Sequence, residues 1–460
     1  MPAIDAIDAI ILADDATSRV RIAGLAARER AVRVARRVGA ERIHIIDGDR
    51  AALADFRTTR PLLVIRADQL VHTPLVAPLI ERFGERFGER FGERFGDRFG
   101  ERFGDRSGDS LRDGTPRDEL AIAVGPDGAY AGAILATGNA ATDVVARLAR
   151  GESDTAIAEA ATTRVPHGTV ARHPIGTPAE RRAATELLYT ILVKPQDNAL
   201  TRYIYRPVSL PLTKLLVWTP ITPNQVSLFV AVIVAFGCWL TAHASTNMAI
   251  AGTAVILSGQ YFDCCDGEIA RIKLQSSRLG AWLDTIIDEA SSIAYMVALG
   301  YHCHLAYGPH YLGDLGFDPW FAMIAVGFVT YVWAMYCIYY NIIVAVGSAN
   351  SQDYVGSFDV VPGRQPNAVR LRPAAPTAIA TKELPPWLAF VATYLPYVVR
   401  RDFLSWISLF LAILHLTHVL FVLLAAGGVV TAVIVTGDHI RLRRLRRAII
   451  AGGQVLEPAS

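Results

Sequence analysis

Six apolar segments in the second half of the sequence constrain the fold of this chain more than any other feature. They cover residues 225–242, 249–270, 279–301, 321–346, 403–416 and 418–435. A helix needs about 20 apolar residues to cross a bilayer, and only helices or closed barrels satisfy their backbone polar groups there. We therefore expect an α-helical integral membrane domain with six transmembrane helices, over residues 224–447.

The positive charges indicate how these helices are oriented. Loops 243–248 and 302–320 contain no Lys or Arg, whereas Arg271, Lys273 and Arg278 flank one turn and 441–447 form a basic tail. Because Lys and Arg accumulate in cytoplasmic loops, both termini are expected in the cytoplasm, which requires an even number of spans. No basic stretch followed by an apolar core opens the chain, so we expect no cleavable signal peptide. The predicted location is a multi-pass protein of the cell inner membrane.

The net charge and the cysteines argue against a nucleic-acid-binding protein and against a disulfide-stabilised protein. The formal net charge is only +2, which does not favour nucleic acid as a partner. The five cysteines all lie in apolar stretches without metal-ligand spacing. They are expected to be small buried residues rather than a disulfide framework.

Residues 1–190 are expected to form a cytoplasmic α/β domain with a mostly parallel sheet. Short β-rich runs at 9–13, 43–46 and 62–65 alternate with helical patterns such as 25–38. Within this domain, 82–112 contains a repeated Arg-Phe-Gly-Glu unit and is predicted to be a flexible insertion. The alternative is a headgroup-binding or self-associating segment. Residues 191–223 mix apolar and basic side chains, as in a juxtamembrane helix lying on the bilayer.

Four aspartates interrupt the second and third apolar segments. They are Asp263, Asp266, Asp284 and Asp288. Each would cost a few kcal/mol at membrane depth unless paired, hydrated or bound to metal. Spacings of three and four place each pair on one helix face, so two adjacent helices can direct four acids at one point. Convergent carboxylates repel one another, whereas Mg²⁺ or Mn²⁺ would keep them ionised.

Intramembrane acids also occur in ion and proton transporters, which is the competing interpretation. No charge beyond Glu289 continues toward the far side in these segments, which argues against a relay path. The small residues Gly267, Ala270 and Gly280 allow helices to approach closely, or leave room for a nucleotide against the backbone.

The complete run from Asp263 to Asp288 is far more specific than its parts. It fits Asp-x2-Asp-Gly-x2-Ala-Arg-x8-Gly-x3-Asp-x3-Asp at every fixed position, a match expected by chance on the order of 10⁻¹⁰ per starting point. This run resembles the motif of the CDP-alcohol phosphotransferase family, also called CDP-alcohol phosphatidyltransferases. The resemblance covers roughly the second half of the chain, including Thr222-Pro223-Asn224 and Arg401-Asp402.

The resemblance implies a reaction and its participants. Family members are six-span membrane enzymes that make phospholipids and related phosphodiesters. The donor would be a CDP-alcohol such as CDP-diacylglycerol or a CDP-polyol, and the acceptor an alcohol such as inositol phosphate or glycerol phosphate. CMP would be the leaving group. We also expect the chain to form a homodimer in the lipid bilayer.

The resemblance also implies a role for each residue of the motif. Asp263, Asp266 and Asp284 would bind two Mg²⁺ or Mn²⁺ ions, and Asp288, close to the metals and counted among their ligands, would be the catalytic base. Nucleotide binding would fall to Gly267, Ala270, Arg271 and Gly280, although Arg271 could also anchor its helix at the interface. The candidates for acceptor binding are Arg202, Arg206 and Arg278, and the first two could instead contact lipid headgroups.

The N-terminal domain resembles, more weakly, the sugar-phosphate nucleotidyltransferases fused to archaeal inositol-phosphate enzymes. The residues that carry this resemblance are Ile10-Ile11-Leu12-Ala13, Glu29-Arg30-Ala31, Ala67-Asp68 and Thr177-Pro178-Ala179-Glu180. An active member needs a glycine-rich loop for the nucleotide phosphates. Here 14–19 contains no glycine and begins with two acids. The domain is therefore predicted to be a non-catalytic relative; the alternative is a bifunctional enzyme that makes its own CDP-alcohol.

Overall fold

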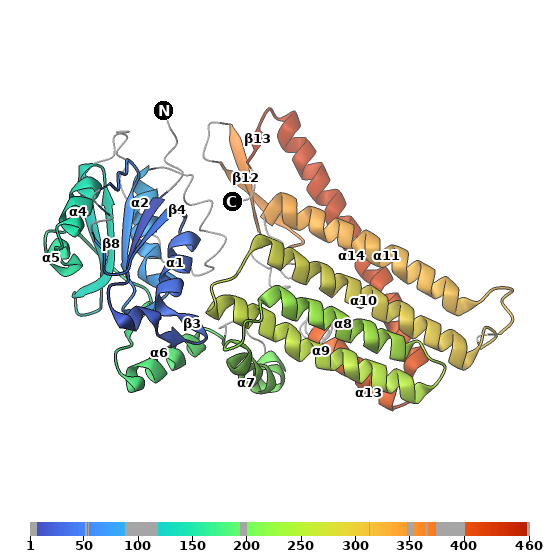
Figure 1. Ribbon diagram of the computed structural model, residues 1–460. Coiled ribbons are helices and arrows are strands. Elements are labelled where there is room, and N and C mark those ends of the chain that lie inside the picture. Colours follow the sequence, from blue (N-terminus) through green and yellow to red (C-terminus); the bar gives the residue numbers. More distant parts are fainter. Residues whose placement is uncertain are drawn as a thin grey trace. The chain divides into compact units, whose positions relative to one another are not determined.

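The computed structural model describes residues 7–50, 53, 55–87, 118–193, 200–311, 313–346, 354–363, 367–373 and 401–457. The chain divides into two compact units (Figure 1). The first unit comprises Met1–Pro195, Lys214–Pro220 and Glu268–Gln275. The second comprises Gln196–Thr213, Ile221–Gly267 and Ser276–Ser460.

A six-stranded sheet forms the centre of the first unit, in the order β4-β1-β5-β8-β7-β9. Strand β1 is parallel to β4 and to β5, and β7 is parallel to β9, while β8 runs antiparallel to both of its neighbours. The expectation of an α/β domain with a mostly parallel sheet is therefore confirmed. The strands are β1 (Ile7–Leu12), β4 (Ala40–Ile46), β5 (Leu62–Arg66), β7 (Glu119–Val124), β8 (Tyr130–Thr137) and β9 (Thr163–Pro166).

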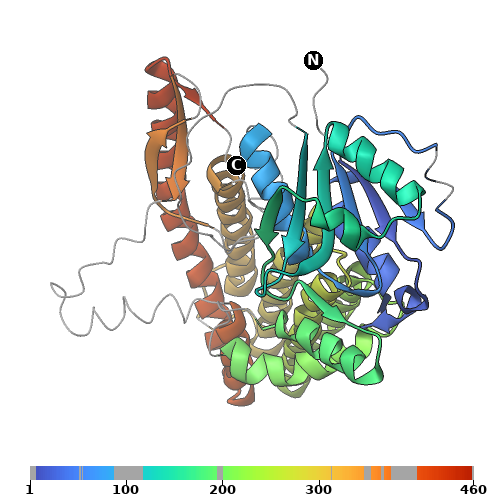
Figure 2. The ribbon, with the colours of Figure 1, turned by 90° about the vertical axis from the view of Figure 1, so that its left-hand side faces the viewer.

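Helices cover both faces of this sheet, because alternate residues of each strand point to opposite sides. Ile7, Ala9 and Ile11 pack in one core with α1 (Ala27–Arg37) and α2 (Ala77–Phe87). Ile10 and Leu12 pack in a second core with α4 (Asn139–Ala149) and α5 (Asp154–Glu159). Figure 2 shows α2 in blue and α4 in teal on opposite sides of the sheet.

Short elements complete the first unit. A separate two-stranded sheet pairs β6 (Gln69–Val71) with β10 (Arg172–Pro174) in antiparallel orientation. The helix expected over 25–38 begins at Ala27, because Leu25–Ala26 form β3, which pairs with β2 (Arg21–Ile22). The others are η1 (Ala16–Arg19), η3 (Thr73–Leu75) and α6 (Pro178–Thr190).

The predicted insertion at 82–112 differs from expectation at its start. Helix α2 continues through the first repeat to Phe87, because Phe83 lies on the same face as Leu79 and Ile80 and is buried with them. Packing of one repeat phenylalanine thus extends the helix despite the glycine at position 84. Residues 88–117 lie outside the part of the chain that the structure describes.

The second unit is built from long helices that coincide with the six expected apolar segments. They are α8 (Pro223–Thr241), α9 (Thr246–Ile272), α10 (Arg278–Tyr307), α11 (Pro319–Asn341), α13 (Arg401–Ile413) and α14 (Thr417–Ala451). Three helical stretches in the described part of the chain are long and apolar enough to cross a membrane: Pro223–Thr241, Pro319–Val346 and Thr417–Ala451. Helix α13 is shorter than these three, and α9 and α10 carry the charged residues of the motif.

Glycines bring α8 and α9 into close contact. A Cβ at Gly252 would lie 2.5 Å from the carbonyl oxygen of Gly237 and 2.4 Å from the hydroxyl of Thr241. Any larger residue at position 252 would force the two helices apart, as at other small-residue helix interfaces. This contact fixes α9, which carries half of the motif, against α8.

The far end of α14 carries a small sheet. Strands β11 (Phe358–Pro362) and β12 (Ala368–Pro373) form an antiparallel pair, and β13 (Val455–Leu456), which follows α14, pairs in parallel with β12. Val369 and Leu371 pack against Leu442 and Ile449 of α14. Figure 2 shows these strands beside the end of that helix.

Candidate functional site

Three of the four motif aspartates converge between α9 and α10. One carboxylate oxygen from each of Asp263, Asp284 and Asp288 lies within 4.8 Å of the other two, and all three residues are half-buried. Asp284 and Asp288 are four residues apart on α10, so they share one helix face, as their spacing predicts. Ser277 caps this helix, because its hydroxyl accepts a hydrogen bond from the amide of Gly280 at 2.9 Å.

This arrangement suits a divalent cation. Carboxylate oxygens are hard ligands of the kind that Mg²⁺ and Mn²⁺ take, and several carboxylates within a few ångströms repel one another unless a cation or protons neutralise them. The donor set and its convergence therefore fit the metal that the motif predicts. The identity and number of ions stay predictions.

Asp266 has a different environment. Its side chain is almost fully buried, and its Oδ2 accepts a hydrogen bond from the hydroxyl of Ser227 on α8 at 2.5 Å. Its Oδ1 accepts from the amide of Gly267. Asp284 and Asp288 are near enough for their charges to act on it. Asp266 thus borders the three converging carboxylates while binding α9 to α8, and its role as a metal ligand stays a prediction.

The predicted nucleotide-binding residues lie along the same two helices. Gly267 is exposed, and a Cβ there would meet no atom within 4 Å, so its backbone is open to a ligand. At Gly280 a Cβ would lie 3.1 Å from the side chains of Asn224 and Ser277, so a larger residue would require both to shift by a few tenths of an ångström. Ala270 and Arg271 occupy the last turn of α9, and both are half-buried.

Two of the predicted acceptor-binding arginines differ in exposure. Arg202 is exposed in the π-helical turn η4 (Thr201–Tyr205), whereas Arg206 is buried at the start of α7 (Arg206–Leu216). Arg278 is the first residue of α10. The structure thus places Arg206 in the protein interior. Its role in acceptor binding or in contact with lipid headgroups stays a prediction.

Two contacts hold η4 and the start of α7 against α9. The Tyr205 hydroxyl donates to Gln260 Oε1 at 2.6 Å, and the Cys265 thiol donates to the carbonyl oxygen of Ser209 at 3.7 Å. Val208 on α7 and Tyr203 on η4 are exposed apolar side chains. An exposed apolar face of this kind is typical of a helix that lies on a membrane, as the sequence predicts for residues 191–223.

One further residue of this region is not predicted by the motif. Glu289 follows Asp288 on α10, and its two carboxylate oxygens accept hydrogen bonds from the hydroxyls of Tyr331 at 2.6 Å and Tyr339 at 3.0 Å. Both tyrosines lie on α11, eight residues apart and therefore on one helix face. The spacing of the two tyrosines could have predicted that they share a helix face, but only the fold shows that this face contacts Glu289.

In the N-terminal unit, the acids of the loop 14–19 are engaged within the protein. Asp14 accepts from Arg50 Nη2 at 2.6 Å and from the amide of Gly48 at 3.2 Å. Asp15 caps η1 by accepting from the amide of Thr17 at 3.0 Å, and Arg19 pairs with Asp47 at 2.9 Å. These contacts fit the prediction that this loop does not cradle phosphates.

The other residues of the weaker resemblance also have local roles. Arg66 holds Asp68, the candidate metal aspartate of the N-terminal domain, through Nε at 3.2 Å and Nη2 at 2.5 Å. Thr177 and Glu180 form a reciprocal cap at the start of α6. These contacts account for the three residues as parts of the fold.

Comparisons with known proteins agree with the motif. Residues 220–434 match the family model described as CDP-alcohol phosphatidyltransferase. A protein of Rubrobacter xylanophilus named bifunctional IPC transferase and DIPP synthase is 32% identical over 115 residues, which are 25% of this chain and 26% of that protein. A protein of the same name from Thermococcus kodakarensis is 31% identical over 130 residues, 28% of each chain.

A third relative with this name, from Aquifex aeolicus, is 29% identical over 129 residues, 28% of this chain and 29% of its own length. The chain thus matches less than a third of the length of each of these relatives. The family match, in contrast, covers the helices that carry all four motif aspartates. Residues 220–434 of this chain are therefore similar to the CDP-alcohol phosphatidyltransferase family, as the motif predicts.

Proposed function

We propose that this protein is a CDP-alcohol phosphotransferase, which moves a substituted phosphoryl group from a CDP-alcohol to the hydroxyl of an acceptor alcohol and releases CMP. The observation that carries this proposal is the convergence of the Asp263, Asp284 and Asp288 carboxylates within the domain that matches the family. The donor would be CDP-diacylglycerol or a CDP-polyol.

The aspartates would divide the work between metal binding and proton transfer. Asp263, Asp266 and Asp284 would hold two Mg²⁺ or Mn²⁺ ions, with Asp288 beside them. When bound, such ions neutralise charge on a pyrophosphate and stabilise the attacking and leaving oxygens. An alcohol is a poor nucleophile at neutral pH, so a carboxylate within hydrogen-bond reach is needed to take its proton. Asp288, one turn from Asp284, would be that base.

The nucleotide would bind along α9 and the start of α10. The exposed backbone at Gly267 gives a ligand access, and Ala270 and Gly280 add little bulk. Arg271 would neutralise charge on the nucleotide phosphates. Arg202, Arg206 and Arg278 are proposed to bind the acceptor, in which case a phosphorylated alcohol such as inositol phosphate or glycerol phosphate would suit three guanidinium groups.

The membrane topology completes this proposal. Six spans, α8, α9, α10, α11, α13 and α14, would place both termini in the cytoplasm of a multi-pass inner-membrane protein, as a homodimer. Exposed apolar side chains such as Leu228 and Val232 on α8 and Val433 on α14 fit lipid contact. The acids of α9 and α10 would be tolerated because they face one another and their metals.

A bifunctional enzyme is the second candidate. The names of the relatives from Rubrobacter, Aquifex and Thermococcus all begin with that word, and the N-terminal unit has the fold class expected of a nucleotidyltransferase-like domain. The internal ion pairs of the loop 14–19 favour a single activity.

The test is turnover by the Asp284→Asn variant. The amide keeps the shape of the side chain but removes a ligand charge, so CMP release from CDP-alcohols in lipid is expected to be abolished while the protein folds and inserts normally. The matched control is Asp318→Asn at the N-cap of α11, which replaces an aspartate of the same unit outside the motif by a residue that can still accept the capping hydrogen bonds. Retained activity of Asp284→Asn at saturating Mg²⁺ or Mn²⁺ would contradict the metal assignment.

A further inference from the structure

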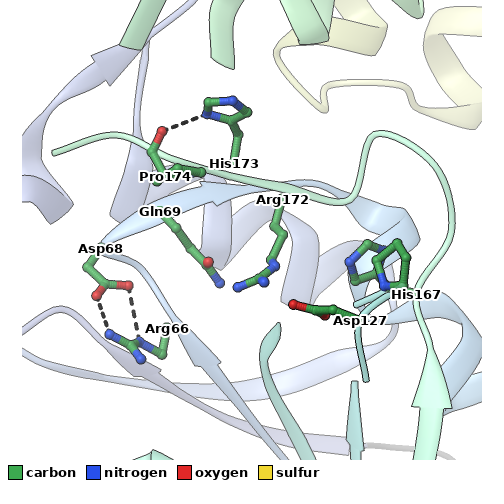
Figure 3. Close-up of a pocket in the computed structure, with 9 residues that line it drawn as sticks. Arg66, Asp68, Gln69, Asp127, His167, Arg172, His173 and Pro174 are labelled. Atoms are coloured by element: carbon green, nitrogen blue, oxygen red, sulfur yellow. Dashed lines mark hydrogen bonds and ion pairs between the residues drawn. The ribbon is translucent and has the colours of Figure 1, made fainter. Parts of the chain in front are cut away.

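The N-terminal unit contains a polar cavity of about 660 Å³ that no function has yet explained (Figure 3). It lies at the carboxyl end of β5, where open α/β sheets commonly bind ligands. Its walls come from the end of β5, the β6–β10 pair, the turn between β7 and β8, and the segment after β9. The lining residues are Arg66, Asp68, Gln69, Pro126, Asp127, His167, Arg172, His173 and Pro174.

Two glycines leave room for polar side chains that line the cavity. Gly132 has a φ of +91°, and a Cβ there would lie 2.2 Å from Gln69 Nε2, which instead donates to the carbonyl oxygen of Ala131 at 2.9 Å. A Cβ at Gly125 would lie 2.7 Å from Asp127 Oδ1. The cavity wall is thus shaped by backbone positions where a side chain would displace a polar lining group.

The two arginines of the cavity differ in their partners. Arg66 binds Asp68 through two nitrogens and lies 3.7 Å from Asp154. Arg172 extends from β10 into the cavity toward Gln69 and Asp127 (Figure 3). No hydrogen bond or ion pair engages its guanidinium among the residues that the structure describes. A half-buried guanidinium with five donors and no protein acceptor is positioned to bind an oxyanion.

The remaining groups add acceptors around this cation. His167 donates from Nδ1 to the carbonyl oxygen of Gly168 at 2.8 Å, so Nε2 of the neutral ring is an acceptor. Asp127 Oδ1 accepts from the amide of Ala129 at 3.0 Å, and no hydrogen bond engages Oδ2 within the described part of the chain. Donors on one side and acceptors on the other suit a ligand that carries both an anionic group and hydroxyls.

We propose that this cavity binds a small hydroxylated molecule bearing a phosphate or carboxylate group, with the anion held by Arg172 and the hydroxyls by Asp127 and His167. A nucleotide is a poor fit. None of the residues 14–19 lines the cavity, and Asp14 and Asp15 are occupied by internal contacts. The site binds its ligand without a phosphate-cradling loop, as an effector site separate from the aspartates of α9 and α10.

The experiment is calorimetric titration of the full-length chain in detergent, at constant ionic strength, with inorganic phosphate, glycerol phosphate, malate and CTP. Saturable binding of an oxyanion with hydroxyls is expected, and glycerol phosphate against malate distinguishes a phosphate from a carboxylate ligand. Arg172→Gln should weaken binding about 10-fold or more, since it removes charge-assisted hydrogen bonds. Arg172→Lys keeps the charge but loses the planar guanidinium, so its affinity should lie between those of the unmodified chain and of Arg172→Gln.

Arg164→Gln is the matched control, because Arg164 is an exposed arginine on β9 of the same unit and does not line the cavity. It should bind as the unmodified chain does, and unchanged thermal unfolding of each variant would show that the fold is intact. The proposal is overturned if no oxyanion binds saturably, if Arg172→Gln and Arg164→Gln bind alike, or if CTP binds more tightly than every smaller anion in an Arg172-dependent manner.

Discussion

At the scale of single residues, the four motif aspartates have two kinds of neighbour. Asp263, Asp284 and Asp288 face one another, whereas Asp266 is bound by Ser227 and by the amide of Gly267. A carboxylate that accepts hydrogen bonds from a hydroxyl and an amide is oriented before any ligand arrives. Asp266 can therefore fix α9 relative to α8 and also present an oxygen to the site.

Substitutions of Asp288 and Asp263 should separate base catalysis from metal binding. Asp288→Asn is expected to leave CDP-alcohol and metal affinity nearly unchanged and to lower the chemical step by roughly 10²- to 10⁴-fold, the usual contribution of a positioned base. Asp263→Asn should instead weaken metal-dependent nucleotide binding. The measurements are Mn²⁺ and CDP-alcohol titrations beside single-turnover CMP release. Equal loss of metal binding in both variants would make Asp288 a ligand.

His72 in the N-terminal unit should make that unit less stable in acid. Burial, reinforced by the charges of Arg30 and Arg37, lowers the pKa of His72 from 6.5 to about 3. Between these values the unfolded chain binds more protons than the folded one, so stability is full above pH 6.5 and falls as the pH drops. The slope from this residue is up to about 1.4 kcal/mol per pH unit.

Native-state hydrogen exchange of β5 and β6 peptides, followed from pH 7 to 4.5, measures this effect. His72→Gln should reduce the loss of protection over that range, since glutamine does not titrate. An identical pH profile for the variant and the unmodified chain would show that other groups carry the dependence.

Residue spacing predicted part of the site and could not predict the rest. The four-residue interval between Asp284 and Asp288 is enough to place both on one face of α10. That Asp266 meets Ser227, 39 positions earlier, depends on how α8 packs against α9. The cavity around Arg172 is equally a product of the fold, because it unites residues from the ends of several strands.

At the scale of elements, α10 is held between the site and α11. Its Asp288 faces the other acids, and the adjacent Glu289 accepts hydrogen bonds from Tyr331 and Tyr339. Because consecutive residues on a helix point about 100° apart, fixing Glu289 also fixes the rotation of α10 and hence the direction of Asp288. Glu289 is thus a positioning residue of the proposed reaction.

Removing the hydroxyl groups of both tyrosines should misplace Asp288 without preventing the substrate from binding. The double variant Tyr331→Phe/Tyr339→Phe is expected to lower kcat by up to about 10²-fold, the effect of a misplacement near 1 Å, with little change in KM for the CDP-alcohol. Tyr336→Phe is the control, since Tyr336 lies on the same helix but is exposed and reaches Arg443 instead. Unchanged kcat in the double variant would show that Glu289 packs against α11 without positioning Asp288.

The helices themselves followed closely from the apolar pattern, and the short strands did not. Each of the six apolar segments is the core of a helix, because runs of this length have few other stable conformations. Strands β11 and β12 were missed, since each has only five or six residues and such short runs give a weak signal. Their partner β13 lies more than 80 residues away in sequence.

At the scale of the whole molecule, the two units differ in the chemistry they can support. The first has no glycine in its candidate phosphate loop, where Asp14 pairs with Arg50 and Asp15 caps η1. The full-length chain should therefore show no CTP-dependent nucleotidyl transfer to sugar or polyol phosphates. Pyrophosphate release from CTP, measured with the Asp284→Asn variant to silence the other reaction, would show instead that the enzyme is bifunctional.

The pairing of β13 with β12 has a consequence for the order of biosynthesis. Val455 and Leu456 are translated after every helix of the second unit, yet they complete the sheet begun by β11 and β12. Until then the edge of β12 is open and ready to pair with any extended chain nearby. This sheet can therefore be completed only after α14 has been synthesised and its C-terminal end lies beside β12, in the segment that precedes α13.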